Sequence, residues 1–225
     1  MKQISIFAII LALFTLSSFM PQQKKKVIFF GDSITEAGAK PGGYITRIAD
    51  LATKEGTAAN YDFVGAGIGG NKVYDLYLRL EDDVLSKKPD VVVIYIGVND
   101  VWHKRSYGTG TDANKFEGFY NALIKKIQAQ GAKIILCTPA VIGERTDFSN
   151  ELDGDLNFYS NMIRNIAKKN SLPLVDLRTA FLDYNKQYNK DNKESGVLTS
   201  DRVHLNEKGN QFVADEMWKV LKQLQ

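Results

Sequence analysis

The stretch Val91-Val92-Val93-Ile94-Tyr95-Ile96 is apolar at every position, with no alternation between polar and apolar residues. A strand covered on both faces has this pattern, because neither row of its side chains meets water. Similar apolar runs cover residues 27–30, 61–64, 133–138 and 174–177. Helical patterns lie between and after these runs, near residues 44–53, 73–85, 114–128, 157–169 and 207–224. This alternation predicts a parallel sheet between layers of helices.

Length and composition fit one globular domain. The chain has 225 residues, of which 44% are hydrophobic and 24% are charged, which is enough apolar material for a sizeable core. The net charge of +3 is too small to indicate a nucleic-acid partner. Cys137 is the single cysteine, so no disulfide can form within one chain, and no Cys/His spacing typical of zinc occurs. We therefore expect no metal; nothing in the sequence sets the oligomeric state.

The N-terminal residues indicate export. One positive charge, Lys2, precedes an almost entirely apolar run from Ile4 to Met20, which is typical of a secretory signal peptide. The run lacks a clean small-x-small cleavage site. An uncleaved anchor is the alternative, because about 17 apolar residues are the minimum for a membrane span. We expect a leader over residues 1–20, a folded domain over residues 24–225, an exported protein (periplasmic or extracellular), and membrane contact only through the leader.

The loop Gly65-Ala66-Gly67-Ile68-Gly69-Gly70 fits the G-x-G-x-x-G pattern of dinucleotide-binding proteins. It follows the second expected strand instead of the first, and Asp82, Asp83 and Asp90 do not lie where the ribose-binding acid belongs. A nucleotide-dependent oxidoreductase is therefore only an alternative, and we expect no cofactor. The loop is otherwise a tight turn, or it presents the backbone N–H of Gly70 to a substrate.

Two further loops could carry catalytic groups. Ser33 follows the first strand in Gly31-Asp32-Ser33-Ile34-Thr35, at the strand end where open α/β sheets bind ligands. Its hydroxyl is a candidate nucleophile, although a turn or helix cap is the simpler interpretation. Gly97-Val98-Asn99-Asp100 ends the third strand, so Asn99 is expected at the same sheet edge. A side-chain amide and a backbone N–H that converge near a serine form an oxyanion hole.

The search for a base is short, because the chain has two histidines, His103 and His204. Asp201 lies three residues before His204, a spacing at which a carboxylate in a turn can reach the imidazole Nδ1–H and orient the ring. His103 also has an acid near it in sequence, Asp100, but it is a loop histidine beside Trp102, an arrangement more typical of a surface or pocket-wall residue than of a base. We therefore favour His204 as the general base and expect Trp102 and His103 to line the pocket.

In this order, the four stretches resemble the four sequence blocks of the SGNH (GDSL) hydrolases, and the resemblance covers nearly all of the chain after the leader. It implies a flavodoxin-like three-layer α/β/α sandwich with about five parallel strands. Arg202 stands where the family usually has glycine, a departure that does not touch the chemistry.

The resemblance also implies residue roles. Ser33 matches the nucleophile, and Asp201 and His204 match the acid and the base. The oxyanion donors are the backbone N–H groups of Ser33 and Gly70 and the side chain of Asn99. Gly69 is the alternative to Gly70, because glycine stands here where the family often has another small residue.

The implied activity is hydrolysis of a carboxylic ester through an acyl-enzyme. The loops over residues 97–111 and 140–155 are long but not markedly apolar, so we expect no lipid-binding lid. A short-acyl substrate, such as an acetyl ester on a carbohydrate, is the first choice. A lysophospholipase, lipase or thioesterase acting on longer chains is the main alternative. Acyl transfer to a sugar uses the same residues, and a non-catalytic glycan-binding domain is the alternative from another class.

Overall fold

The computed structural model describes residues 23–224, which form a five-stranded parallel sheet in the order β2-β1-β3-β4-β5. The strands are β1 (Lys25–Gly31), β2 (Tyr61–Gly67), β3 (Val91–Tyr95), β4 (Lys133–Cys137) and β5 (Leu174–Val175). This order is that of flavodoxin-like sheets. The predicted leader, residues 1–20, lies outside the described residues.

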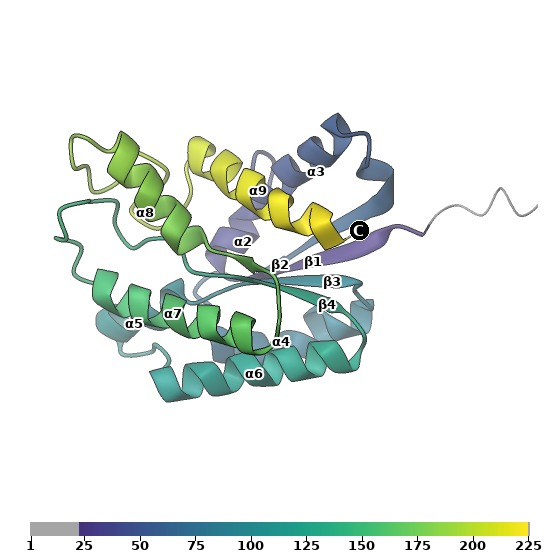
Figure 1. The fold of residues 1–225 in the computed structure, drawn as a ribbon. Coiled ribbons are helices and arrows are strands. Elements are labelled where there is room, and N and C mark those ends of the chain that lie inside the picture. Colours follow the sequence, from purple (N-terminus) through teal and green to yellow (C-terminus); the bar gives the residue numbers. More distant parts are fainter. Residues whose placement is uncertain (1–22, 225) are drawn as a thin grey trace, which may run out of the picture.

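Helices cover both faces of the sheet (Figure 1). One layer contains α2 (Ser33–Gly38), α3 (Tyr44–Lys54), α8 (Leu177–Tyr188) and α9 (Glu207–Leu221). The other contains α4 (Val73–Asp83), α5 (Val98–Tyr107), α6 (Ala113–Ala129) and α7 (Asp153–Lys169). The predicted three-layer sandwich is therefore confirmed. None of the helices described within residues 23–224 is long and apolar enough to span a bilayer.

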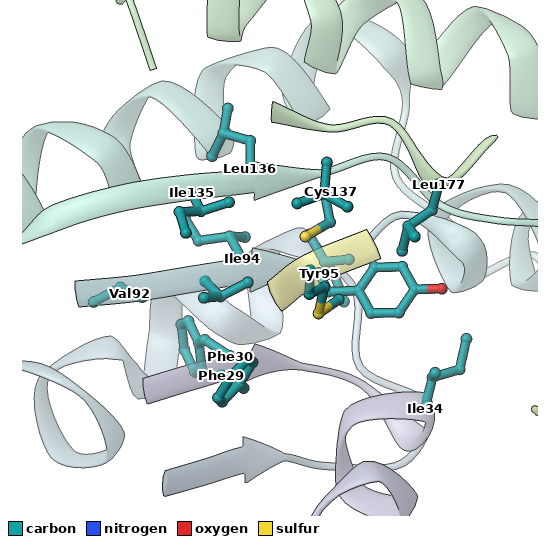
Figure 2. Close-up of a cluster of buried hydrophobic side chains, with 14 of the residues drawn as sticks. Phe29, Phe30, Ile34, Val92, Ile94, Tyr95, Ile135, Leu136, Cys137 and Leu177 are labelled. Carbon is teal, nitrogen blue, oxygen red and sulfur yellow. The ribbon is translucent and has the colours of Figure 1, made fainter. Parts of the chain in front are cut away.

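The core is built where the central strands meet both helical layers. Side chains of β1, β3 and β4 pack together with Ile34 of α2 and Leu177 of α8 (Figure 2). Every residue of β3 is buried, as expected for a strand without a polar face. Burial of such strands supplies most of the favourable free energy of folding, at about 25 cal/mol per Å² of apolar surface.

The register of the sheet brings three strand ends to one level. Gly31, the last residue of β1, pairs with Gly67 of β2 and with Tyr95 of β3. The connections that follow these strands therefore leave the sheet side by side. At the opposite edge, the Nζ atoms of Lys25 and Lys133 donate to the carbonyl of Leu224, at 3.4 and 3.2 Å. The beginning of β1 and the end of the described chain are thus neighbours at one end of the strands, and Ser33 lies at the other end.

Two parts of the predicted pattern are wrong. Residues 97–111, expected to be a loop, contain α5, because its inward side carries the buried polar residues Asn99 and Asp100 beside Val98 and Val101. These polar residues interrupt the regular spacing of apolar residues by which a helix is recognised in a sequence. The last strand ends at Val175 instead of residue 177, because Asp176 caps α8 by accepting from the backbone N–H of Thr179. The short helix α2 and the helix α8 were not predicted.

Candidate active site

Ser33 is the first residue of α2 and lies directly after a turn that only glycine allows. A Cβ on Gly31 would lie 2.4 Å from the carbonyl oxygen of Tyr95. Only a residue without a side chain can therefore pass this close to the end of β3 as the chain leaves β1. Asp32 caps the helix, its carboxylate accepting from the N–H of Ile34 at 3.0 Å. Burial raises the pKa of Asp32 to about 7. The backbone N–H of Ser33 lies at a helix start, where such groups have no intrahelical acceptor.

A chain of hydrogen bonds joins Ser33 to two residues near the C-terminus. Ser33 Oγ lies 2.9 Å from His204 Nε2, and His204 Nδ1 lies 2.7 Å from Asp201 Oδ2. The other oxygen of Asp201 accepts from the backbone N–H of His204 at 2.8 Å. Burial acts to raise the pKa of Asp201, but hydrogen bonds from His204 and Val203, with the charge interaction with His204, together lower the pKa below its usual value. A charged Asp201 keeps the proton of a neutral imidazole on Nδ1 and turns the lone pair of Nε2 toward the serine.

Glu144 holds the segment that leads to Asp201 and His204. Its carboxylate is buried and accepts from the backbone N–H groups of Val197, Leu198 and Thr199 at 2.8, 2.6 and 2.9 Å. A buried carboxylate with these partners fixes the backbone, because losing it would leave unpaired N–H groups. No sequence pattern marks Glu144, because its hydrogen-bond partners lie more than fifty residues further along the chain.

The glycine-rich loop after β2 lies against α2. A Cβ on Gly67 would lie 2.1 Å from the backbone nitrogen of Glu36, and one on Gly69 would lie 3.9 Å from Ser33 Cβ. The N–H of Gly69 already donates to the carboxylate of Glu36 at 2.8 Å. Within residues 23–224, the N–H of Gly70 has no hydrogen-bond partner. Between the two candidates, the geometry therefore favours Gly70 as the donor to a substrate.

Asn99 reaches the same place from α5. Its side chain is buried and donates one amide N–H to the carbonyl of Asn71 at 3.1 Å. Because an amide nitrogen carries two hydrogens, the second remains for a substrate oxygen.

Gly70 has a φ of 75°, a conformation that glycine adopts without strain. The Lys72 ammonium, also buried, donates to the Gly70 carbonyl at 2.7 Å.

Arg79 of α4 joins these loops through hydrogen bonds. No sequence pattern marked it as a functional residue. Its guanidinium donates to the carbonyls of Gly31 and Ala66, at 2.7 and 3.1 Å, and its Nε donates to Asn71 Oδ1 at 2.7 Å. It thus binds the ends of β1 and β2 and the residue that orients Asn99. Its only sequence signal, Asp83 four residues later, is typical of an ordinary helix pair.

His103 and Trp102 lie on the first turns of α5, and both are half-buried. A Cβ on Gly70 would lie 3.7 Å from His103 Cε1, so this ring borders the loop that carries Gly70. Burial, with a smaller effect of Lys72, lowers the pKa of His103. The rings of Trp102 and His103 are 5.5 Å apart. His103 therefore lies beside the loop that carries Gly70, with Trp102 next to it on α5. Within residues 23–224 no carboxylate binds the His103 ring, and Asp100 accepts instead from the N–H of Val73 at 3.1 Å.

Replacing Asn99 with alanine is expected to lower kcat for p-nitrophenyl acetate by about a hundredfold, because one oxyanion donor is lost. KM should change much less, since the donor acts on charge that develops in the transition state. Asn71→Ala is the matched control: it removes a side chain of the same loop but keeps the carbonyl that Asn99 binds. Steady-state kinetics of both variants provide the measurement. A kcat for Asn99→Ala within twofold of that of the unaltered protein would contradict the assignment.

In the part of the chain that the structure describes, no group of three or more His, Cys, Asp or Glu side chains could hold a metal ion. The described site offers serine, imidazole, carboxylate and amide groups.

Known proteins are similar to this chain in sequence and in fold. A model of the GDSL-like lipase/acylhydrolase family matches residues 29–212. An acetylxylan esterase from Geobacillus stearothermophilus is 30% identical over 206 residues, which are 84% of this chain and 90% of that protein. The crystal structure of the acetyl xylan esterase AlAXEase is 63% identical, with a TM-score of 0.85 over 86% of this chain and 98% of that one. A catalytic mutant of the Geobacillus enzyme is 28% identical, with a TM-score of 0.78 over 90% of this chain and 96% of that one.

The family match begins inside β1 and ends inside α9, so it includes all four loops that meet at the carboxyl edge of the sheet. The resemblance first read from short motifs is thereby confirmed over most of the chain. The chain belongs to the GDSL-like lipase/acylhydrolase family and is a carboxylic ester hydrolase.

Proposed function

We propose that the protein is a secreted serine esterase that removes acetyl groups from carbohydrate esters. The observation that carries the proposal is the continuous hydrogen-bonded chain from Ser33 through His204 to Asp201, at 2.9 and 2.7 Å. This arrangement activates a serine hydroxyl as a nucleophile. The acetylxylan esterases among the relatives support an acetylated sugar as the substrate.

In this mechanism, His204 Nε2 takes the proton from Ser33 Oγ as the oxygen attacks the ester carbonyl carbon. The carbonyl oxygen becomes an oxyanion that accepts hydrogen bonds from the N–H groups of Ser33 and Gly70 and from the Asn99 side chain. His204 then protonates the departing sugar oxygen, which leaves an acetyl group on Ser33. A water molecule, deprotonated by His204, attacks this acyl-enzyme, and acetate leaves as Ser33 recovers its proton.

Asp201 acts through His204. Its negative charge stabilises the imidazolium that forms each time His204 accepts a proton. The side chain of His204 is 37% exposed, so water has direct access to the base during deacylation. Transfer of the acetyl group to a second sugar would use the same residues with a hydroxyl in place of water.

The surroundings of the site support a small acyl group. A cavity that adjoins Trp102 is lined mostly by charged and polar side chains, whereas a long acyl chain requires an apolar channel. Export is part of the proposal, and the apolar run from Ile4 to Met20 supports it.

A series of p-nitrophenyl esters from C2 to C16, run beside acetylated xylan and acetylated pectin, tests the substrate class. We expect kcat/KM to be highest at C2 and to fall by about tenfold or more by C8, because the described site offers no apolar channel for the additional methylenes. Acetate release from the polysaccharides, measured enzymatically, should show whether carbohydrate esters are cleaved. A maximum at C8 or longer would replace the proposal with a lipase or thioesterase.

A further inference from the structure

A cavity of about 320 Å³ lies between α5, the loop after β4 and the segment after α8. These three segments lie on the same side of the molecule, at the left in Figure 1. Its walls include Trp102, Arg105, Arg145, Glu194 and Arg202; we call it the arginine cavity. The volume is at the lower end of the range of small-molecule sites and suits one sugar unit.

The arginine cavity adjoins the reaction centre along the chain. Trp102 lies three residues after Asn99, and Arg202 lies between Asp201 and His204. The carbonyl of Arg202 accepts from the N–H of Gly143 at 2.9 Å, which joins two walls of the cavity. Two walls of the cavity thus belong to the same segments as Asn99 and His204, so a unit that neighbours a sugar bound at Ser33 is the ligand these walls suit best.

Positive charge exceeds negative charge in the arginine cavity. Glu194 pairs with two guanidinium groups: its Oε1 lies 2.8 Å from Arg202 Nη1 and its Oε2 lies 3.7 Å from Arg145 Nη2. Within residues 23–224, Arg105 has no ion pair and no hydrogen bond from its side chain. Glu151 also lines the cavity, so three arginines face two glutamates. A neutral sugar would leave this excess charge without a counterion.

The backbone at Arg202 gives a second, independent indication. Its φ is 84°, a conformation that glycine adopts freely and that strains other residues. Glycine is the residue that the family resemblance leads one to expect here. An arginine at this position accepts the strain and adds a guanidinium to the wall of the cavity.

We propose that the arginine cavity binds the carboxylate of a uronic acid unit next to the acetylated sugar. A guanidinium can donate two parallel hydrogen bonds to a carboxylate, which a neutral hydroxymethyl group cannot accept in the same way. In this proposal Arg105, which has no other partner in the described chain, binds the carboxylate, and Arg202 and Arg145 add positive charge. Trp102 lines the same cavity and would contact the sugar ring. This inference rests on the proposed function, because it names a preference within the acetylated carbohydrates.

The test compares three sets of acetylated oligosaccharides of equal length: xylo-oligosaccharides without uronic acid, the same with a glucuronic acid branch, and galacturonate oligomers. We expect kcat/KM to be about tenfold higher for at least one uronate-bearing set than for the neutral set. The set that is preferred identifies whether the carboxylate belongs to a branch or to the main chain. Adding 0.5 M salt, on the order of three times physiological ionic strength, should reduce the preference.

Arg105→Gln, in which an exposed side chain is replaced, should lower the ratio of kcat/KM on the preferred uronate substrate to that on the neutral substrate by about tenfold. Lys125→Gln, on the exposed side of α6, removes the same charge elsewhere and should leave the ratio unchanged. Equal rates on all three sets, or an Arg105→Gln ratio like that of the unaltered protein, would overturn the inference while leaving the esterase proposal intact. No acetate release from any of the three sets would instead contradict the proposed function.

Discussion

Replacing His204 with alanine is expected to lower kcat for p-nitrophenyl acetate by roughly 10⁶-fold, and Ser33→Ala should do the same. The two losses should be equal because the serine and its base act as one unit, so that removing either abolishes the nucleophile. The double variant should be no slower than either single variant. Stopped-flow and steady-state kinetic assays of the three variants provide the measurement, and circular dichroism confirms that each variant is folded.

His103→Ala is the informative comparison for this experiment. His103 borders the loop that carries Gly70, but within residues 23–224 no carboxylate hydrogen-bonds to its ring, and burial lowers its pKa. We therefore expect a loss far smaller than that of His204→Ala. If His103→Ala were inactive and His204→Ala active, the base would be His103 and the proposed mechanism would have to be abandoned.

Asp201→Asn should have the second largest effect, a fall in kcat of about 10⁴-fold. The amide oxygen can still accept from the backbone N–H of His204, so the turn is kept. Its NH₂ group would then face His204 Nδ1 and donate to it, which moves the imidazole proton to Nε2. In that tautomer Nε2 cannot accept the proton of Ser33.

Asp201→Ala separates the two roles of the carboxylate. Alanine does not impose the wrong tautomer, so this variant should retain more activity than Asp201→Asn. The kcat of both variants across pH 5–9 gives the comparison. An Asp201→Asn enzyme within tenfold of the unaltered protein would show that Asp201 does not orient the base.

Much of the fold could be predicted because the strands are apolar throughout. Residues 91–96 have no polar face, and a strand of this kind fits only the interior of a parallel sheet. Once parallel strands are assumed, their carboxyl ends share one edge. This explains why Ser33, Gly70 and Asn99, far apart in sequence, could be expected together.

The parts that were missed depend on contacts that sequence patterns do not record. The helix α5 carries Asn99 and Asp100 on its buried side, so the residues that serve the site obscure the helical period. Arg79 and Glu144 organise loops through long-range hydrogen bonds to backbone atoms. A backbone carbonyl or N–H is present at every position, so nothing in the sequence marks which ones will receive such a bond.

Lys25 and Leu224 are neighbours at the amino end of β1, whereas Ser33 follows its carboxyl end, and this has a practical consequence. A solid support, a fluorescent label or a carbohydrate-binding module joined at either of these positions would project away from the catalytic face. Polymeric glycans should then reach an immobilised enzyme as freely as small esters do. The same geometry would let two different modules be attached to one enzyme, side by side, without either one shielding the serine.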